Sequence, residues 1–96
     1  MDRRRYLVTY DVADDERRTK IFRSLMQRGD HTQYSVFMCE LTAGELARLR
    51  RVLEEMVNHE LDQVLLVDLG PAARDSGRVV GSVGRPYLPP IRALVV

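Results

Sequence analysis

The stretch that decides the fold is Tyr6-Leu7-Val8-Thr9-Tyr10-Asp11-Val12, followed at once by Ala13-Asp14-Asp15-Glu16-Arg17-Arg18. Its first part is β-branched and aromatic, which predicts a buried strand. Its second part predicts a helix start, because Asp14 suits an N-cap and the acidic residues after it suit the positive end of the helix dipole. The chain therefore begins with a strand that leads directly into a helix.

Asp11 is the residue of this stretch that most needs an explanation. Side chains alternate along a strand, so Asp11 shares one face with Leu7 and Thr9. The opposite face carries Tyr6, Val8 and Tyr10. A carboxylate near the end of an apolar strand is costly to bury unless it is paired, hydrogen-bonded or bound to a metal. Asp11 is therefore the first candidate for a functional residue.

The composition is that of one small globular domain. The chain has 96 residues, of which 45% are hydrophobic, and a formal net charge of +1. This balance argues against disorder and does not by itself indicate nucleic-acid binding. Fourteen of the 15 basic residues are arginines, whose planar fork suits phosphate and carboxylate groups. A compositional bias or thermal adaptation would give the same excess.

The cysteine content and the hydropathy favour a cytoplasmic location. Cys39 is the single cysteine, which excludes an intrachain disulfide. The apolar run after residues 1–5 is too short for a signal peptide, and no stretch approaches the roughly 20 apolar residues of a membrane span. Since His31 has no second ligand at zinc spacing and Cys39 has no identifiable base, we expect neither a zinc site nor a cysteine nucleophile.

The middle of the chain predicts a helix, a β segment and a second helix. The first helix should run over about residues 15–28, with Gly29 just past its end. Residues 31–41 alternate, which predicts either one long strand or two short strands with a sharp bend near Ser35. Thr42-Ala43-Gly44-Glu45 is a capping box, and apolar residues at helical spacing follow it.

The last third of the chain predicts strands and a tail. Residues 63–69 have the pattern of a buried strand, residues 72–78 of a loop, and residues 79–84 of a short strand weakened by glycine. Residues 85–96 form an apolar, proline-led tail that should be extended and should pack on a partner. We therefore predict one domain over residues 1–84 and a tail over residues 85–96.

This order of elements predicts an α+β fold. Strand, helix, strands, helix and strand match the ferredoxin-like βαββαβ sandwich, with an extra short C-terminal strand. Helices would cover one face of the sheet and leave the other face for a homodimer or a ligand. The fold itself implies no function.

The charged residues around the first strand end have two interpretations. Arg17, Arg18 and Lys20 either pair with the acidic residues at 14–16 or form a positive rim beside a metal-bound phosphate. Residues 3–5 are all arginines, and they form either a solvated flank or contacts to phosphate. Sequence spacing alone leaves both interpretations open.

Two motifs of this chain occur together. The first is Tyr10-Asp11-Val12 with Asp14, Asp15, Arg17 and Arg18; the second, after Gly29, is Gln33-Tyr34-Ser35-Val36-Phe37. With the small size of the chain, these motifs closely resemble the Cas2 family of CRISPR-associated spacer-acquisition proteins. The matching motifs fall within residues 6–41, and the later elements match in order and length only. Lys20 stands where some members place Arg.

The resemblance implies a cytosolic, ferredoxin-like homodimer with facing sheets. In the family the strand-end aspartates of the two subunits, here Asp11 and its mate, hold one divalent metal, typically Mg²⁺. Members are described as metal-dependent endonucleases on RNA or duplex DNA, and they bridge dimers of the CRISPR integrase and bind the DNA being captured. Tyr10, Arg18, Ser35 and Phe37 match positions close to the active site of the family.

Three functions follow as hypotheses. The first is a dimeric, Mg²⁺-dependent phosphodiesterase with Asp11 as metal ligand and Arg18 steadying phosphate, since Mg²⁺ takes one or two carboxylates and can activate a water. The second is a non-catalytic adaptor that clamps DNA and binds the integrase through residues 85–96. The third ignores the resemblance and is a regulatory domain for a small molecule, without affinity for nucleic acid.

Overall fold

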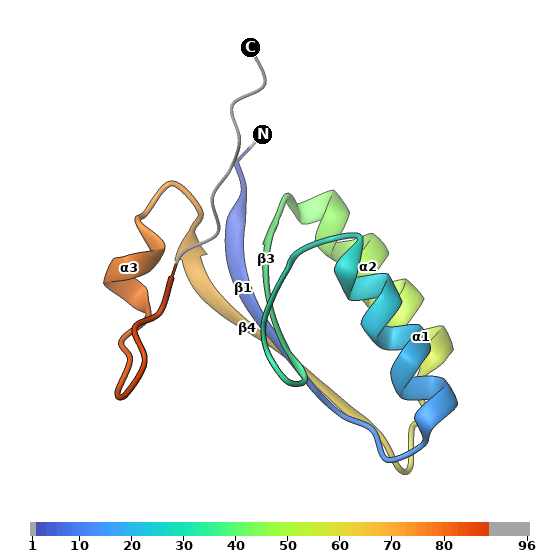
Figure 1. The fold of residues 1–96 in the computed structure, drawn as a ribbon. Helices are drawn as coiled ribbons and strands as arrows, with labels where there is room; N and C mark the ends of the chain where they lie inside the picture. Colours follow the sequence, from blue (N-terminus) through green and yellow to red (C-terminus); the bar gives the residue numbers. More distant parts are fainter. Residues whose placement is uncertain (1, 89–96) are drawn as a thin grey trace.

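A computed structural model of the chain describes residues 2–88. Its elements are β1 (Arg4–Asp11), α1 (Asp15–Met26), β2 (Asp30–Gln33), β3 (Val36–Leu41), α2 (Ala43–Met56), β4 (Gln63–Pro71) and α3 (Ser76–Val79). The four strands form one antiparallel sheet in the order β2-β3-β1-β4, and α1 and α2 lie side by side on one face of it (Figure 1). The predicted α+β, ferredoxin-like arrangement is confirmed.

The hydrophobic core lies between the sheet and the two long helices. From β1 it takes the residues predicted to share one face, Tyr6, Val8 and Tyr10, and from the other elements chiefly Phe37, Cys39, Ile21, Leu25, Leu49 and Leu53. Leu7 and Thr9, on the opposite face of β1, are only half-buried. The alternation in the sequence therefore assigned both faces of the central strand correctly.

The helix α1 begins as predicted and ends two residues early. The Asp14 carboxylate accepts a hydrogen bond from the Arg17 amide at 2.9 Å, so Asp14 is the N-cap. The C-cap is Gln27, and Gly29 serves a different purpose. A Cβ on Gly29 would stand 2.5 Å from Cys39 Sγ and 2.6 Å from the Met38 carbonyl oxygen, so glycine is needed there because the chain passes so close to β3.

The alternation over residues 31–41 corresponds to two strands. β2 and β3 pair antiparallel around a tight turn at Tyr34 and Ser35, where Ser35 has a left-handed φ of 62°. The predicted capping box before α2 is also confirmed. The Thr42 hydroxyl accepts from the Glu45 amide at 3.2 Å, and the Glu45 carboxylate accepts from the Thr42 amide at 2.8 Å.

The prediction of a short strand over residues 79–84 was wrong. The chain forms the single-turn helix α3 instead, which begins inside the predicted loop, and residues 80–88 have no regular structure. Asp75 caps this turn by accepting a hydrogen bond from the Gly77 amide at 3.0 Å. Gly84 then adopts a φ of +88°, which no regular strand permits, and within residues 2–88 no strand lies beside this segment.

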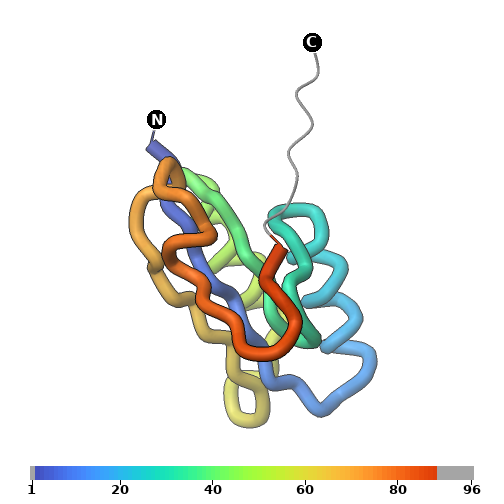
Figure 2. The backbone as a smooth tube through the Cα atoms, turned by 60° about the vertical axis from the view of Figure 1, so that its left-hand side comes forward, coloured from blue at the N-terminus to red at the C-terminus, as the bar shows by residue number. Residues whose placement is uncertain are grey.

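The segment after β4 crosses the sheet face opposite α1 and α2 (Figure 2). Arg5 anchors its beginning, because the buried guanidinium donates hydrogen bonds to the carbonyl oxygens of Arg74 at 2.6 Å and Ala72 at 2.9 Å. A groove of ≈ 980 Å³ remains between this segment and residues such as Leu7 and Met38. The face that we expected to be open is therefore partly covered by the chain itself.

The predicted tail is described only in part. Residues 85–88 line the groove just described, and residues 89–96 lie outside the described residues. Packing of the tail on a partner subunit or on an integrase stays a prediction. Among residues 2–88 no helix has the length and apolar character that a membrane span requires.

Candidate active site at the end of the first strand

Asp11 is the last residue of β1 and pairs with Gln63, the first residue of β4. Its side chain is exposed, and within residues 2–88 it makes no hydrogen bond or ion pair. Burying the Asp11 carboxylate without a partner would be costly. The structure avoids this cost because the strand ends in solvent and leaves the side chain exposed. Asp11 thus offers free carboxylate oxygens on the surface.

Tyr10 and Ser35 hold the strand end to the neighbouring turn. The Tyr10 amide donates a hydrogen bond to the Ser35 carbonyl oxygen at 3.1 Å. The Tyr10 ring is buried on the helix side of the sheet, and this burial raises its pKa, while a side-chain hydrogen bond with Ser35 acts in the opposite direction. The Tyr10 hydroxyl therefore stays neutral near neutral pH.

Phe37 is part of the core beneath the site. It is 0% exposed, and its ring lies 6.3 Å from that of Tyr10, 4.8 Å from that of His31 and 5.6 Å from that of Phe22. A fully buried ring contacts no nucleic acid in this conformation. Phe37 can contribute to the site only by supporting Tyr10 and the β2–β3 hairpin.

Arg18 binds the loop that connects β1 to α1. One of its terminal nitrogens donates to the carbonyl oxygens of Val12 at 3.0 Å and Ala13 at 3.1 Å, and the other forms an ion pair with Asp15. The sequence allowed Arg18 either to pair with the acidic residues at 14–16 or to face a phosphate, and in this structure it pairs with Asp15. The positive charge nevertheless remains beside the loop that follows Asp11.

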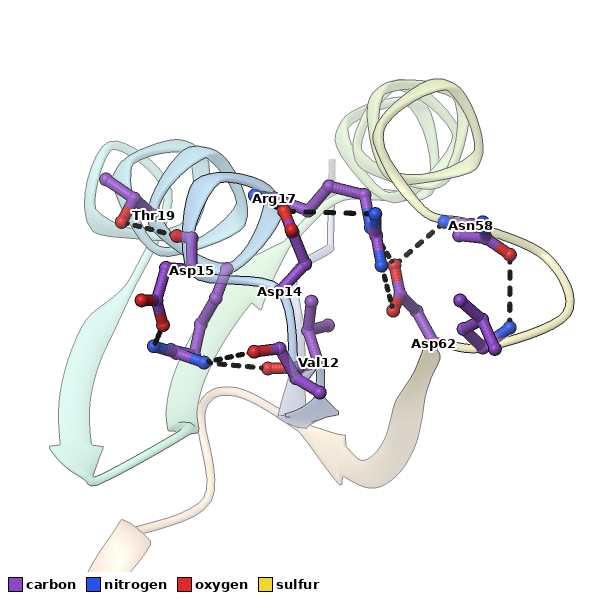
Figure 3. Close-up of polar contacts among 10 residues, drawn as sticks. Val12, Asp14, Asp15, Arg17, Thr19, Asn58 and Asp62 are labelled. Carbon is purple, nitrogen blue, oxygen red and sulfur yellow. Dashed lines mark hydrogen bonds and ion pairs between the residues drawn. The ribbon is translucent and has the colours of Figure 1, made fainter.

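Arg17 has a partner that the sequence did not suggest. Its Nε and Nη2 atoms donate to the two carboxylate oxygens of Asp62 at 2.7 and 3.1 Å, whereas Asp14, the expected partner, is 3.8 Å away (Figure 3). The Asp62 side chain is 1% exposed and also accepts from the Asn58 amide at 2.8 Å. The hydrogen bonds from Arg17 and then from Asn58 lower the pKa of Asp62.

Two residues near the site have no strong signal in the sequence that predicts their place in it. Asp62 lies 45 positions from Arg17 and follows no motif, so only the folded chain brings them together. Tyr34 was quoted as part of a motif, but its exposure of 81% at the tip of the hairpin was not anticipated. A polar residue at the bend of a hairpin is a weak signal for such exposure.

The residues at this strand end fit a divalent metal only as a shared site. Within residues 2–88 of one chain no group of three or more His, Cys, Asp or Glu side chains could hold a metal ion. At the end of β1, Asp11 supplies one exposed carboxylate that has no partner among residues 2–88. Mg²⁺ prefers oxygen ligands and takes one or two carboxylates with water and phosphate oxygens, so two copies of Asp11 suit it.

Comparison with known proteins identifies the family. Residues 4–76 match the family model described as CRISPR associated protein Cas2. The chain belongs to the Cas2 family. A CRISPR-associated endoribonuclease Cas2 from Rhodospirillum rubrum is 38% identical over 82 residues, which cover 85% of this chain and 79% of that protein. Its namesake from Geobacter sulfurreducens is 34% identical over 91 residues, or 95% of each chain.

Solved structures support the same assignment. Cas2 from Streptococcus pyogenes superimposes with a TM-score of 0.73 at 26% identity, covering 83% of this chain and 99% of that chain. The part matched by the Cas2 family model contains Asp11, Arg17, Arg18 and Asp62 and stops before the predicted tail. The family assignment favours the nuclease and the adaptor among the three hypotheses.

Proposed function

We propose that this Cas2 chain forms a homodimer in the cytoplasm and acts in CRISPR spacer acquisition as an Mg²⁺-dependent endonuclease. The observation that carries the proposal is the Asp11 carboxylate, which is exposed and unpaired at the end of β1. The names of the relatives, which are endoribonucleases, favour RNA as the substrate, with duplex DNA as the alternative.

The part of the Asp11 sheet face that the segment after β4 leaves exposed supports dimerisation. Leu65 and Val67 of β4 pair with Thr9 and Leu7 of β1, and they are 48% and 41% exposed. A second copy packed on this face would cover these apolar side chains and bring its own Asp11 towards the first. Two carboxylates brought together repel each other unless a cation neutralises them.

The residues of the chain would have distinct roles at this site. Asp11 from each subunit would hold the metal, which when bound polarises a phosphodiester and activates a water. Arg18 contributes positive charge for the substrate phosphate from its position on the loop carbonyls. Tyr10, Ser35 and Phe37 hold the strand end and the hairpin in place.

Cleavage assays test this proposal. The purified protein is incubated with single-stranded RNA and with duplex DNA, in Mg²⁺ or in EDTA, beside Asp11→Asn. Asp2→Asn is the matched control, because this aspartate is also exposed and lies just before the other end of β1. We expect metal-dependent cleavage that Asp11→Asn abolishes and Asp2→Asn preserves, with an intact dimer in both variants. Cleavage that survives Asp11→Asn would contradict the role of this residue.

A second candidate is a non-catalytic adaptor that binds duplex DNA and the CRISPR integrase. It is favoured by the engagement of Arg18 with the loop and by the burial of Phe37, which leave few free groups around Asp11. This candidate predicts salt-sensitive binding of duplex DNA without cleavage, and normal spacer integration by Asp11→Asn. It also predicts that deleting residues 87–96 abolishes co-purification with the integrase.

A further inference from the structure

Two consecutive arginines of α1 hold opposite sides of the strand end that carries Asp11. Arg18 donates to the carbonyl oxygens of Val12 and Ala13, which directly follow Asp11. Arg17 donates to Asp62, which directly precedes Gln63, the β-sheet partner of Asp11. The first turns of α1 are thus tied both to the end of β1 and to the beginning of β4.

The contact between Arg17 and Asp62 is well suited to fixing a position. Its two parallel hydrogen bonds define a direction as well as a distance, which a single contact to a lysine would not. The Asp62 side chain is almost completely buried and is also held by the Asn58 amide (Figure 3). The Arg17 amide is itself bound by the N-cap Asp14. Neither end of this contact is free to move alone.

We infer that Arg17 and Asp62 are positioning residues for the Asp11 carboxylate. They fix α1 relative to the start of β4, and the pairing of Asp11 with Gln63 transmits that position to the strand end. Neither residue needs to touch the metal or the substrate. The inference rests on the proposed function of Asp11 as a metal ligand.

The chain provides a matched control for this contact. Arg4 and Asp68 also form an ion pair, in which Arg4 Nε donates to the two Asp68 carboxylate oxygens at 2.9 and 3.2 Å, and they join β1 to β4 near the opposite end of the same strand pair. Since the Arg4 and Asp68 side chains are about half exposed and the Asp62 side chain is 1% exposed, the two pairs need not contribute equally to stability, and the variants are compared under conditions in which both are fully folded. A positioning contact should affect Asp11 only from the nearer end.

The test compares two double variants with the wild-type protein. Arg17→Gln with Asp62→Asn removes both charges together, so no buried charge is left unpaired, and the new amide can still accept from Asn58. Arg4→Gln with Asp68→Asn is the control. The measurements are Mn²⁺ affinity by calorimetry, amide hydrogen exchange over residues 11–14, and kcat and KM for RNA cleavage.

We expect the first double variant to remain folded, to bind Mn²⁺ about tenfold more weakly and to lose about 10- to 100-fold in kcat, since small displacements of a reacting group are that costly. Exchange over residues 11–14 should increase, and KM should change little. The control should keep wild-type values. Equal losses of Mn²⁺ affinity and kcat in both double variants would overturn the inference. So would a first double variant that is folded and keeps the wild-type Mn²⁺ affinity and the wild-type amide exchange over residues 11–14.

The outcome also separates this inference from the proposed function. A wild-type protein that neither binds Mn²⁺ nor cleaves RNA would overturn the function and with it the metal-directed role of Arg17 and Asp62. The exchange data would then still decide whether the pair holds the strand end. If the wild-type protein is active and Asp11→Asn is not, a first double variant that keeps full Mn²⁺ affinity overturns the positioning role alone.

Discussion

Replacing Gly29 by alanine should destabilise the fold, because the new methyl group has no room. Its carbon would lie 2.5 Å from Cys39 Sγ and 2.6 Å from the Met38 carbonyl oxygen. The second contact is 0.8 Å short of an ordinary separation of 3.4 Å (3.4 − 2.6 = 0.8). Cys39 is fully buried and the carbonyl belongs to the backbone of β3, so neither neighbour can turn away cheaply.

The magnitude is set by two opposing effects. Overpacking a core typically costs about 1–3 kcal/mol. Replacing glycine by alanine also restricts the unfolded chain, which raises the free energy of unfolding by about 0.4–1 kcal/mol. At the midpoints of these ranges the expected net loss in the free energy of unfolding is about 1.3 kcal/mol (2 − 0.7 = 1.3), which lowers Tm by roughly 5–10 °C in a domain of this size.

Urea and thermal denaturation followed by circular dichroism would measure the effect of Gly29→Ala. Gly44→Ala is the matched control, because a Cβ there would meet only the flexible Arg48 guanidinium at 3.6 Å, in the first turn of α2. Helix propensity predicts a gain of about 0.4–1 kcal/mol for this control. If Gly29→Ala is as stable as the wild type while Gly44→Ala behaves as expected, the steric reasoning is refuted.

Three further predictions concern single side chains. Thr42→Ala removes the cap of α2 and should lower the free energy of unfolding by about 1 kcal/mol in urea titrations, whereas Thr42→Ser should not. The pKa of Asp62 is lowered in the folded state by Arg17, so the stability that this pair contributes is present above the unfolded pKa of about 4 and is lost as the pH falls through the folded value. Urea titrations at several pH values should therefore show that the free energy of unfolding falls more steeply with decreasing pH in the wild type than in Asp62→Asn. Burial raises the pKa of Cys39 to about 11, so thiol reagents should modify it slowly in the native protein and fast in urea.

Local patterns in the sequence predicted the parts of the fold that depend on neighbouring residues. The Asp14 cap and the Thr42 capping box are contacts over three positions, and both formed as expected. The alternation from Tyr6 to Tyr10 separated the core face from the other face of the sheet. The choice between one strand and two near Ser35 needed the folded chain, because alternation continues through a tight hairpin.

Contacts between residues that are distant in the sequence could not be predicted from it. Arg17 was expected to pair with nearby acids, and its chosen partner Asp62 becomes a neighbour only when α1 packs beside the start of β4. The wrong strand over residues 79–84 has a similar origin. Its valines suit a strand, but a strand needs a partner edge, and this segment crosses the face of the sheet without pairing with either edge strand, β2 or β4.

The charges around the strand end explain why the proposed site needs a second subunit. Arg17 and Arg18 both carry positive charge beside Asp11, yet each is satisfied by partners within its own chain. They therefore act on the site through position and through their field, and neither neutralises the Asp11 carboxylate directly. A single unpaired carboxylate on the surface hardly affects the stability of the fold and by itself creates no strongly negative site for a cation. Two such carboxylates facing each other across a dimer would repel each other, and a bound divalent cation would relieve this repulsion. Such a negative site is what a metal-dependent nuclease requires.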